Sequence, residues 1–305
     1  MQLKNKIDHF LNGPSKAIPI KCGPFNFRIS CSNKETLNEI CSLYRNFTIC
    51  EEHEFIDFDV SIRESNNLIR RYFSKQANFF LDSHQPFKPL PAAQGYPMLE
   101  WGMNWCIAST SHQYLIIHAA VINKNETTIL MPAPPGSGKS TLTALLTYSG
   151  WRLLSDELAL IRISNLKVDG LARPINLKNQ SIDVIRNKFP QINHSKIVHD
   201  THKGTVCLFE PPIESIENVN DPVHITHVIF PKYDPKTEIK FNKLEKDSLF
   251  FSLIENSFNY NVLGEVGFDT MLKLVESADG LQFSYSDNDA AIAIFEKLAN
   301  ENYDN

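Results

Sequence analysis

Apolar and polar residues alternate over short stretches of the first hundred positions, as they do in half-buried β-strands. The stretch 54–63 (EFIDFDVSIR) shows this alternation clearly. At 34–44 the apolar residues recur at helical spacing instead. We therefore predict a small sheet with one helix, whose strands lie at 17–31 around a Gly-Pro turn, at 54–63, at 68–74 and at 77–81.

Strand and helix patterns follow one another through the rest of the chain, after a proline-rich connector at 85–97. The predicted helices lie at 98–108, 139–150, 181–188, 244–253, 269–277 and 288–299. The predicted strands lie at 114–122, 127–131, 151–154, 158–163, 206–209, 225–230 and 281–285. This order predicts an α/β fold, with a small α+β module over residues 1–97 and a nucleotide-binding domain with a helical C-terminal segment over residues 98–305.

A glycine loop lies between the strand at 127–131 and the helix that begins near Lys139. Its glycines let successive backbone N–H groups point at a polyphosphate, and the helix N-terminus and Lys139 add positive charge. Ala133 stands where the pattern G-x-x-x-x-G-K-[ST] has its first glycine, and Ser140 is the expected Mg²⁺ ligand. The alternative is a plain Gly/Pro turn before a surface helix. The candidate nucleotide-binding residues are Pro135, Gly136, Ser137, Gly138, Lys139, Ser140 and Thr141.

An acidic pair, Asp156-Glu157, follows the very next predicted strand after the loop helix. Two carboxylates at that place suit a γ-phosphate and its metal ion, with Asp156 as general base and with Glu157, Asp156 and Ser140 as Mg²⁺ ligands. His118, on the strand that leads into the loop strand, is expected to orient or tune the base. The alternatives are a helix N-cap in a solvated turn for the acidic pair and a core histidine for His118.

Basic residues after the acidic pair are candidates for contact with the transferring phosphate. Arg173 and Lys203 each precede a turn residue, and Lys178 is a weaker third candidate; the alternative for each is an ordinary surface charge. Two of the five histidines at 194–227, His224 and His227, would point to opposite faces of one strand, which argues against a metal cluster. The segment 258–260 is expected to supply packing and one polar anchor.

Composition limits the class of protein. The chain has 305 residues, 42% of them hydrophobic, and a formal net charge of −5, which gives no reason to expect nucleic-acid or membrane-surface binding. It has no apolar run long enough to span a bilayer and no secretory signal at its polar start, so we expect a cytoplasmic protein. The six cysteines form no C-x-x-C pair and are expected to be reduced, mostly buried thiols.

The run from His118 through the strand at 158–163 resembles the catalytic core of HPr kinase/phosphorylase. The match comprises the histidine on its strand, the loop PGSGKS and the segment SGWRLLSDE that ends at Glu157. Further motifs resemble the narrower HPr kinase-related kinase A subgroup over about residues 98–268; they include LEW at 99–101, HAAV at 118–121, RPI at 173–175, THKGT at 201–205, FPKY at 230–233 and FNY at 258–260.

The resemblance implies a phosphotransferase with an HPr kinase-like core, akin to phosphoenolpyruvate carboxykinase, that uses ATP and Mg²⁺. Asp156 falls on the family's catalytic base and His118 on its signature histidine, while Glu157 replaces a second aspartate. The family's E-x-R-G-x-G signature is absent, so phosphorylase activity is not expected. The expected acceptor is a serine hydroxyl of a small protein or peptide. The alternatives are a metabolite kinase and a non-catalytic nucleotide-dependent scaffold, and the parent family's hexamers suggest self-association as a homo-oligomer.

Overall fold

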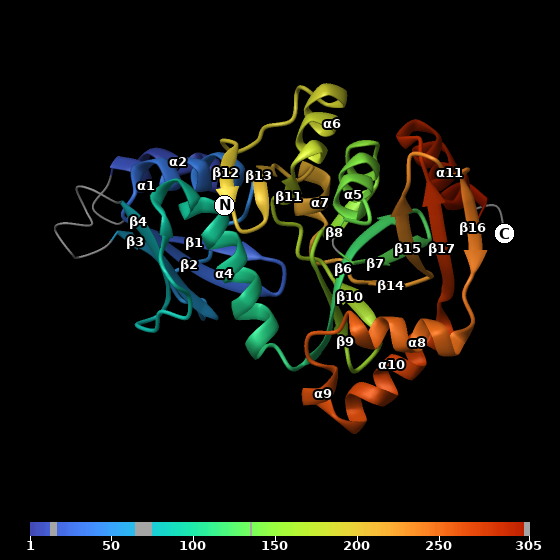
Figure 1. Ribbon diagram of the computed structural model, residues 1–305. Coiled ribbons are helices and arrows are strands. Elements are labelled where there is room, and N and C mark those ends of the chain that lie inside the picture. Colours follow the sequence, from blue (N-terminus) through green and yellow to red (C-terminus); the bar gives the residue numbers. More distant parts are fainter. Residues whose placement is uncertain (13–16, 65–74, 135, 302–305) are drawn as a thin grey trace. The chain divides into compact units, whose positions relative to one another are not determined.

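The computed structural model describes residues 1–12, 17–64, 75–134 and 136–301, which form two compact units of mixed α/β structure (Figure 1). The predicted strand at 68–74 and the candidate loop residue Pro135 lie outside the described residues. Each unit combines segments that are distant in sequence, whereas the modules predicted from the sequence are contiguous. Unit 1 contains Met1–Ile107, Asn176–Asp183 and Gln191–Glu210, and unit 2 contains Ala108–Ile175, Val184–Pro190 and Pro211–Asn305.

Unit 1 is built on a five-stranded sheet in the order β1-β2-β3-β4-β5, in which only β2 and β3 are parallel neighbours. Its strands are β1 (Ala17–Cys22), β2 (Phe25–Cys31), β3 (Phe58–Glu64), β4 (Gln76–Leu81) and β5 (Leu90–Pro91). Its helices are η1 (Leu3–Asn5), α1 (Ile7–Asn12), α2 (Lys34–Leu43), η2 (Ala92–Gln94) and α4 (Gly95–Thr110). A second sheet has the order β11 (Ile175–Lys178), β13 (Gly204–Phe209) and β12 (Val198–Thr201).

Local sequence explains where one helix of unit 1 begins and how another packs. The Asn33 side chain accepts hydrogen bonds from the N–H groups of Glu35 and Thr36 and so caps α2. In α4, a Cβ at Gly102 would lie 2.2 Å from the ring of Phe79 on β4. Only glycine therefore lets α4 pack this closely against the sheet.

Unit 2 is built on a nine-stranded mixed sheet, in the order β14-β10-β9-β6-β7-β15-β17-β16, with β8 paired to β6. Its strands are β6 (Tyr114–Lys124), β7 (Thr127–Pro132), β8 (Arg152–Ser155), β9 (Leu158–Arg162), β10 (Lys167–Asp169), β14 (Val223–His224), β15 (His227–Tyr233), β16 (Lys240–Lys243) and β17 (Asp279–Tyr285). The remaining helices are α5 (Lys139–Tyr148), α6 (Gln180–Lys188), α7 (Ile213–Glu217), α8 (Lys246–Glu255), α9 (Tyr260–Leu263), α10 (Glu265–Ser277) and α11 (Asn288–Glu301).

Strand β6 is the centre of this sheet and of the hydrophobic core beneath it. From Tyr114 to Ile122 every residue is buried except His118, which is half-buried. Alternate side chains on one face, from Leu115 to Val121, pack against the buried sides of α8 and α10. Such an apolar run on both faces is typical of a strand covered on both sides.

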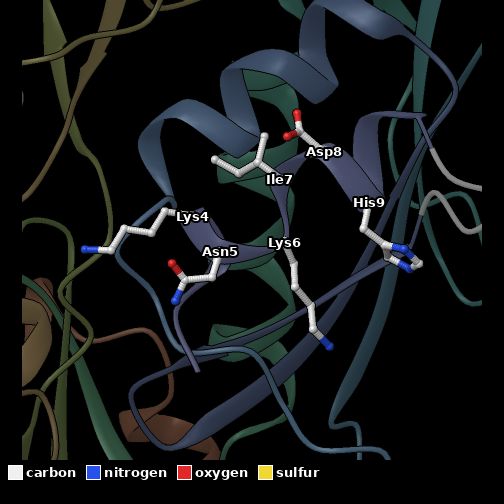
Figure 2. Close-up of a pocket in the computed structure, with 6 residues that line it drawn as sticks. All are labelled: Lys4, Asn5, Lys6, Ile7, Asp8 and His9. Carbon is white, nitrogen blue, oxygen red and sulfur yellow. The ribbon is translucent and has the colours of Figure 1, made fainter.

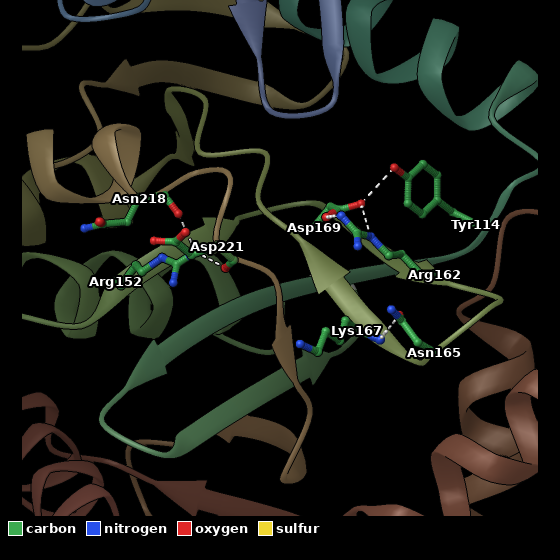
Figure 3. Close-up of polar contacts among 8 residues, drawn as sticks. All are labelled: Tyr114, Arg152, Arg162, Asn165, Lys167, Asp169, Asn218 and Asp221. Carbon is green, nitrogen blue, oxygen red and sulfur yellow. Dashed lines mark hydrogen bonds and ion pairs between the residues drawn. The ribbon is translucent and has the colours of Figure 1, made fainter.

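A polar group fixes one end of β6 to its neighbours (Figure 3). Arg162 on β9 donates two hydrogen bonds to Asp169 on β10, and the Tyr114 hydroxyl of β6 donates a third at 2.8 Å. Burial and the hydrogen-bonded Asp169 carboxylate raise the pKa of Tyr114 above its ordinary range. The three strands are thus joined by side chains as well as by backbone hydrogen bonds.

Most of the predicted elements are confirmed to within about four residues at each end, which is the usual scatter of such boundaries. The strand predicted at 54–63 begins only at Phe58, because a turn occupies the preceding residues. The predicted connector at 85–97 contains β5, η2 and the first turn of α4. The prediction that His224 and His227 lie on one strand was wrong, because His224 lies on β14 and His227 on the separate strand β15.

Two findings concern the class of protein. No described helix combines the length and the apolar character needed to cross a bilayer. All six cysteines are free and buried, which confirms the sequence-based expectation.

Candidate functional site

The register of β6 brings the predicted site segments of unit 2 to one level of the sheet. On one edge Ala119 pairs with Pro132, where β7 ends and the glycine loop begins. On the other edge His118 pairs with Leu158 and Val121 pairs with Ser155, so that Asp156 and Glu157 form the turn between these two pairs. Because directly paired residues have Cα atoms about 4.5–5.5 Å apart, the loop and the acidic turn flank His118–Ala120 from both sides.

The loop after β7 has the backbone that the sequence predicted for it. Gly136 and Gly138 have φ angles of +87° and +90°, which residues with a side chain rarely adopt. Gly138 is also enclosed, since a Cβ there would lie 2.9 Å from Tyr233 Cβ and from the Tyr285 hydroxyl. The N–H of Tyr233 donates to the Ser137 carbonyl at 2.8 Å. The loop is therefore held by β15 and β17, which lie about 100 and 150 residues further along the chain.

Helix α5 begins directly after these glycines, with Gly138 as its N-cap. The dipole of its first turn makes this end of the helix attractive to anions. Lys139 is the first helical residue and is only 8% exposed, while Ser140 and Thr141 are half-buried. A strand, a loop with two left-handed glycines and a helix are thus all present at the predicted places.

The acidic turn is shaped by Ser155, which sequence reasoning did not single out. Ser155 is 2% exposed, and its Oγ accepts hydrogen bonds from the N–H groups of Glu157 at 3.3 Å and of Leu158 at 2.9 Å. Asp156 and Glu157 are half-buried and lie between two strands, so the alternative of a helix N-cap is wrong. A serine before an acidic pair was the available signal, because serine readily bonds the backbone two or three residues ahead.

His118 is held through its backbone by the segment that follows α8. Its N–H donates to the Asn256 carbonyl at 2.7 Å, and its ring centroid lies 5.7 Å from that of Phe258. Asn259 is 1% exposed; its side chain accepts from the Ile116 N–H at 2.9 Å and donates to the Tyr114 carbonyl at 2.8 Å. The predicted polar anchor in 258–260 is therefore confirmed. The half-buried position of the histidine ring differs from that of a core histidine.

The three basic candidates are divided between the units. Arg173 is 4% exposed and belongs to unit 2, where the Leu171 N–H donates to the Leu154 carbonyl at 2.6 Å, so this segment runs beside β8. Lys178 and Lys203 belong to unit 1. The structure therefore brings the loop, His118 and the acidic turn to one sheet of unit 2, with the segment of Arg173 beside that sheet.

Lys203 lies in an aromatic and basic group within unit 1. Its Nζ lies 5.1 Å from the ring centroid of Trp101, and the His202 ring lies 4.6 Å from the same ring. Burial, with the charges of Lys203 and Lys178, lowers the pKa of His202. His202 therefore stays neutral down to a lower pH than a fully solvated histidine would.

The donor set fits magnesium better than zinc. Within the ranges that the structure describes, no three His, Cys, Asp or Glu side chains converge as a metal-binding group. Magnesium does not need such a group, because it binds through one or two carboxylates and keeps waters and substrate phosphates as further ligands. The carboxylates of Asp156 and Glu157 and the hydroxyl of Ser140 are donors of this kind.

A shallow pocket in unit 1 has no connection with the candidate residues (Figure 2). It has a volume of about 270 Å³, and six successive residues line it: Lys4, Asn5, Lys6, Ile7, Asp8 and His9. Figure 2 shows the Lys4 and Lys6 side chains pointing away from each other. No residue predicted to bind nucleotide lines this pocket.

Comparison with known proteins gives structural similarity without sequence similarity. No family model matches the chain, and no curated protein does. A solved structure of the Hpr(Ser) kinase/phosphatase from Coxiella burnetii is similar over 62% of this chain and 97% of its own, with 10% identity and a TM-score of 0.31. A TM-score of this size does not establish a shared fold.

Proposed function

We propose that this protein is a kinase that binds ATP with Mg²⁺ and transfers the γ-phosphate to a serine hydroxyl of a small protein or peptide. The observation that carries the proposal is the pairing on β6, which has the glycine loop at Pro132 on one edge and the acidic turn at Leu158 on the other. The motif resemblance to HPr kinase supports it, because the same residues fall on that family's catalytic positions.

The loop and the start of α5 bind the polyphosphate in this proposal. The positive φ angles of Gly136 and Gly138 favour a loop whose backbone N–H groups can cradle phosphate oxygens. Lys139 adds a full charge at the β- and γ-phosphates. Ser140, Asp156 and Glu157 would hold Mg²⁺, which supplies charge neutralisation at the transferring phosphate.

Asp156 acts as the general base for the acceptor serine. As the serine oxygen forms its bond to the γ-phosphorus, the bond from that phosphorus to the β,γ-bridging oxygen breaks, ADP leaves and the serine proton passes to the carboxylate. His118 orients this carboxylate from the paired strand. Arg173 is proposed to stabilise the charge that spreads over the transferring oxygens.

The proposed chemistry also agrees with a cytoplasmic location. ATP and a reducing environment occur together there, and the six buried free thiols need no oxidising compartment.

Two substitutions test the proposed roles. Lys139→Ala should weaken ATP binding by at least about tenfold, because it removes the charge at the phosphates. Asp156→Asn should keep ATP binding within about threefold and lower transfer by about a hundredfold or more, because the amide cannot accept the proton. Binding is measured with a fluorescent ATP analogue, and transfer with γ-labelled ATP in host extract separated by ultrafiltration.

The fraction that carries the label decides between acceptors. Label in one macromolecular band that is lost with Asp156→Asn supports a protein or peptide kinase. Label only in the small-molecule fraction would replace it by a metabolite kinase on the same core. Near-normal transfer by Asp156→Asn would overturn the role of that residue. ATP binding without transfer in either fraction would favour a nucleotide-dependent scaffold.

A further inference from the structure

Exposed large apolar side chains are concentrated in one part of unit 2. Single exposed apolar residues are ordinary, but a group of them marks an interaction surface. Six of the ten in the described chain lie within 22 residues of sequence. They are Phe251 (65% exposed), Phe258 (50%), Val262 (66%), Val266 (50%), Phe268 (45%) and Leu272 (39%), and we refer to them as the α8–α10 face.

Aromatic contacts connect the three helices of this face. The ring of Phe250 lies 5.8 Å from that of Phe251 on α8, 6.5 Å from that of Tyr260 on α9 and 5.6 Å from that of Phe268 on α10. In Figure 1 these helices lie next to one another below the central sheet. Two of the exposed residues, Phe251 and Phe268, therefore belong to one aromatic cluster that spans these helices.

The outer side of α10 combines apolar and acidic side chains. Phe268 and Leu272 are one turn apart, and the buried residues Met271 and Leu274 face the core on the other side. Between and beside the apolar pair, at helical spacing, stand exposed carboxylates: Glu265, Asp269 and Glu276. The surface of α10 is thus apolar with a negatively charged rim.

The charge excess continues through the whole segment. Residues 245–279 contain seven acidic and two basic side chains. One of the two basic residues, Lys246, is already engaged with the carbonyls of Val275 and Ala278 at the end of α10. A second copy placed face to face would oppose like charges. A partner with apolar and basic side chains matches both features of the surface.

The face also begins beside the candidate site. Phe258 belongs to it, and its ring lies 5.7 Å from the ring of His118. The preceding Asn256 carbonyl accepts the His118 N–H. A segment bound on the face would therefore end near the residues to which transfer is assigned.

We propose that the α8–α10 face binds an amphipathic basic segment of the acceptor protein and so presents the acceptor serine to the site. The proposal rests on the proposed kinase function. An amphipathic helix laid on an apolar surface is a common way to recognise a peptide, and docking on the same chain raises the effective concentration of the serine.

A binding experiment with the full chain tests the surface without nucleotide. The probe is a fluorescein-labelled leucine–lysine peptide of about 18 residues, long enough to form an amphipathic helix, and the comparison peptide has glutamate in place of lysine. Fluorescence anisotropy should show binding of the lysine peptide at least about tenfold tighter than that of the glutamate peptide.

Matched variants distinguish binding at this surface from nonspecific hydrophobic binding. Val262→Ser combined with Val266→Ser and Leu272→Ser should weaken binding of the lysine peptide about tenfold or more, because apolar area is lost. Ile213→Ser removes an equally exposed apolar side chain elsewhere in unit 2 and should leave binding within about twofold. Glu265→Gln with Asp269→Asn should weaken the lysine peptide and reduce its salt dependence.

Each remaining outcome has a definite meaning. Equal binding of both peptides, or unchanged binding by the triple variant, would overturn the docking surface. Concentration-dependent dimers that the triple variant abolishes, measured by sedimentation equilibrium, would assign the face to a second copy instead. Wild-type transfer separates the proposals: if the wild-type protein binds the lysine peptide but transfers no phosphate, the kinase function fails and the surface stands.

Discussion

Gly136 and Gly138 are neighbours in the loop with similar backbone angles but different surroundings. Both have positive φ, yet a Cβ at Gly136 would meet no atom within 4 Å, whereas one at Gly138 would meet Tyr233 and the Tyr285 hydroxyl at 2.9 Å. The pair therefore separates the cost of the backbone angle from the cost of crowding.

We expect Gly136→Ala to lower the free energy of unfolding by about 1 kcal/mol, through the left-handed backbone alone. Gly138→Ala should lower it by about 2–4 kcal/mol, because the tyrosines must also move. Urea unfolding measures both. Equal losses for the two variants would contradict the role assigned to Tyr233 and Tyr285.

His227 makes stability depend on pH. It is 9% exposed on β15, and burial lowers its pKa below the ordinary value of 6.5, against a smaller opposing effect of Asp279. The folded protein therefore keeps this ring neutral at a pH at which the unfolded chain already binds a proton. Because the unfolded state then binds more protons, stability falls as the pH drops below about 6.5.

We expect the free energy of unfolding to decrease between about pH 7.5 and pH 5.5, and His227→Gln to make the decrease smaller. The comparison variant is His202→Gln, which removes an exposed histidine whose pKa is also lowered. Urea unfolding at several pH values gives the slopes. A decrease in His227→Gln as steep as in the wild type would assign the effect to other groups.

At the scale of elements, β6 depends on a short segment far along the chain. Strand β7 pairs with one edge of β6 only from Ala119 onward. The part of β6 before Ala119 is covered on that edge by the segment around Ser257, which forms a β-bridge with Ile117. Asn259 supplies a side-chain amide to two backbone groups of β6 at this place. It replaces strand pairing where the neighbouring strand is missing.

Asn259→Ala should lower the free energy of unfolding by about 3 kcal/mol, because it leaves an N–H and a carbonyl of β6 buried without this partner. Asn165→Ala is the matched control: that exposed side chain accepts one hydrogen bond from the Lys167 N–H in a turn, and its loss should cost less than about 1 kcal/mol. Urea unfolding compares the two. A loss below about 1 kcal/mol for Asn259→Ala would contradict the anchoring role.

At the scale of the whole molecule, the thiols report on the integrity of unit 1, whose segments are far apart in the sequence. Five cysteines belong to segments of the first hundred and seven residues and Cys207 to a later segment of unit 1, while all six are buried. Burial raises the pKa of Cys31, Cys41 and Cys50 to about 11, so little thiolate forms near neutrality.

We therefore expect native protein at about pH 8 to react with a thiol-specific disulfide reagent far more slowly than unfolded protein, which should release the signal of six thiols. Absorbance of the released thiolate measures both. Rapid reaction of several thiols in native protein would contradict the compact packing of unit 1.

The sequence by itself determined features that depend on neighbouring residues. The period of apolar side chains identified most strands and helices, and Gly-Ser-Gly before Lys139 identified the strand–loop–helix and its left-handed backbone. The sequence predicted element boundaries less well where local signals conflict. A turn occupies the start of the predicted strand, so that β3 begins only at Phe58. Helix α4 begins inside a proline-rich stretch, because proline is tolerated in the first turn of a helix.

Only the tertiary structure decided which distant segments meet. The pairing of β6 with both the loop strand and the acidic turn, the enclosure of Gly138 by two tyrosines and the anchoring by Asn259 join residues that are far apart in sequence. The same holds for unit 1, which includes segments after residue 175. Periodicity shows which side of an element is buried, but the partner that buries it is selected by packing across the whole chain.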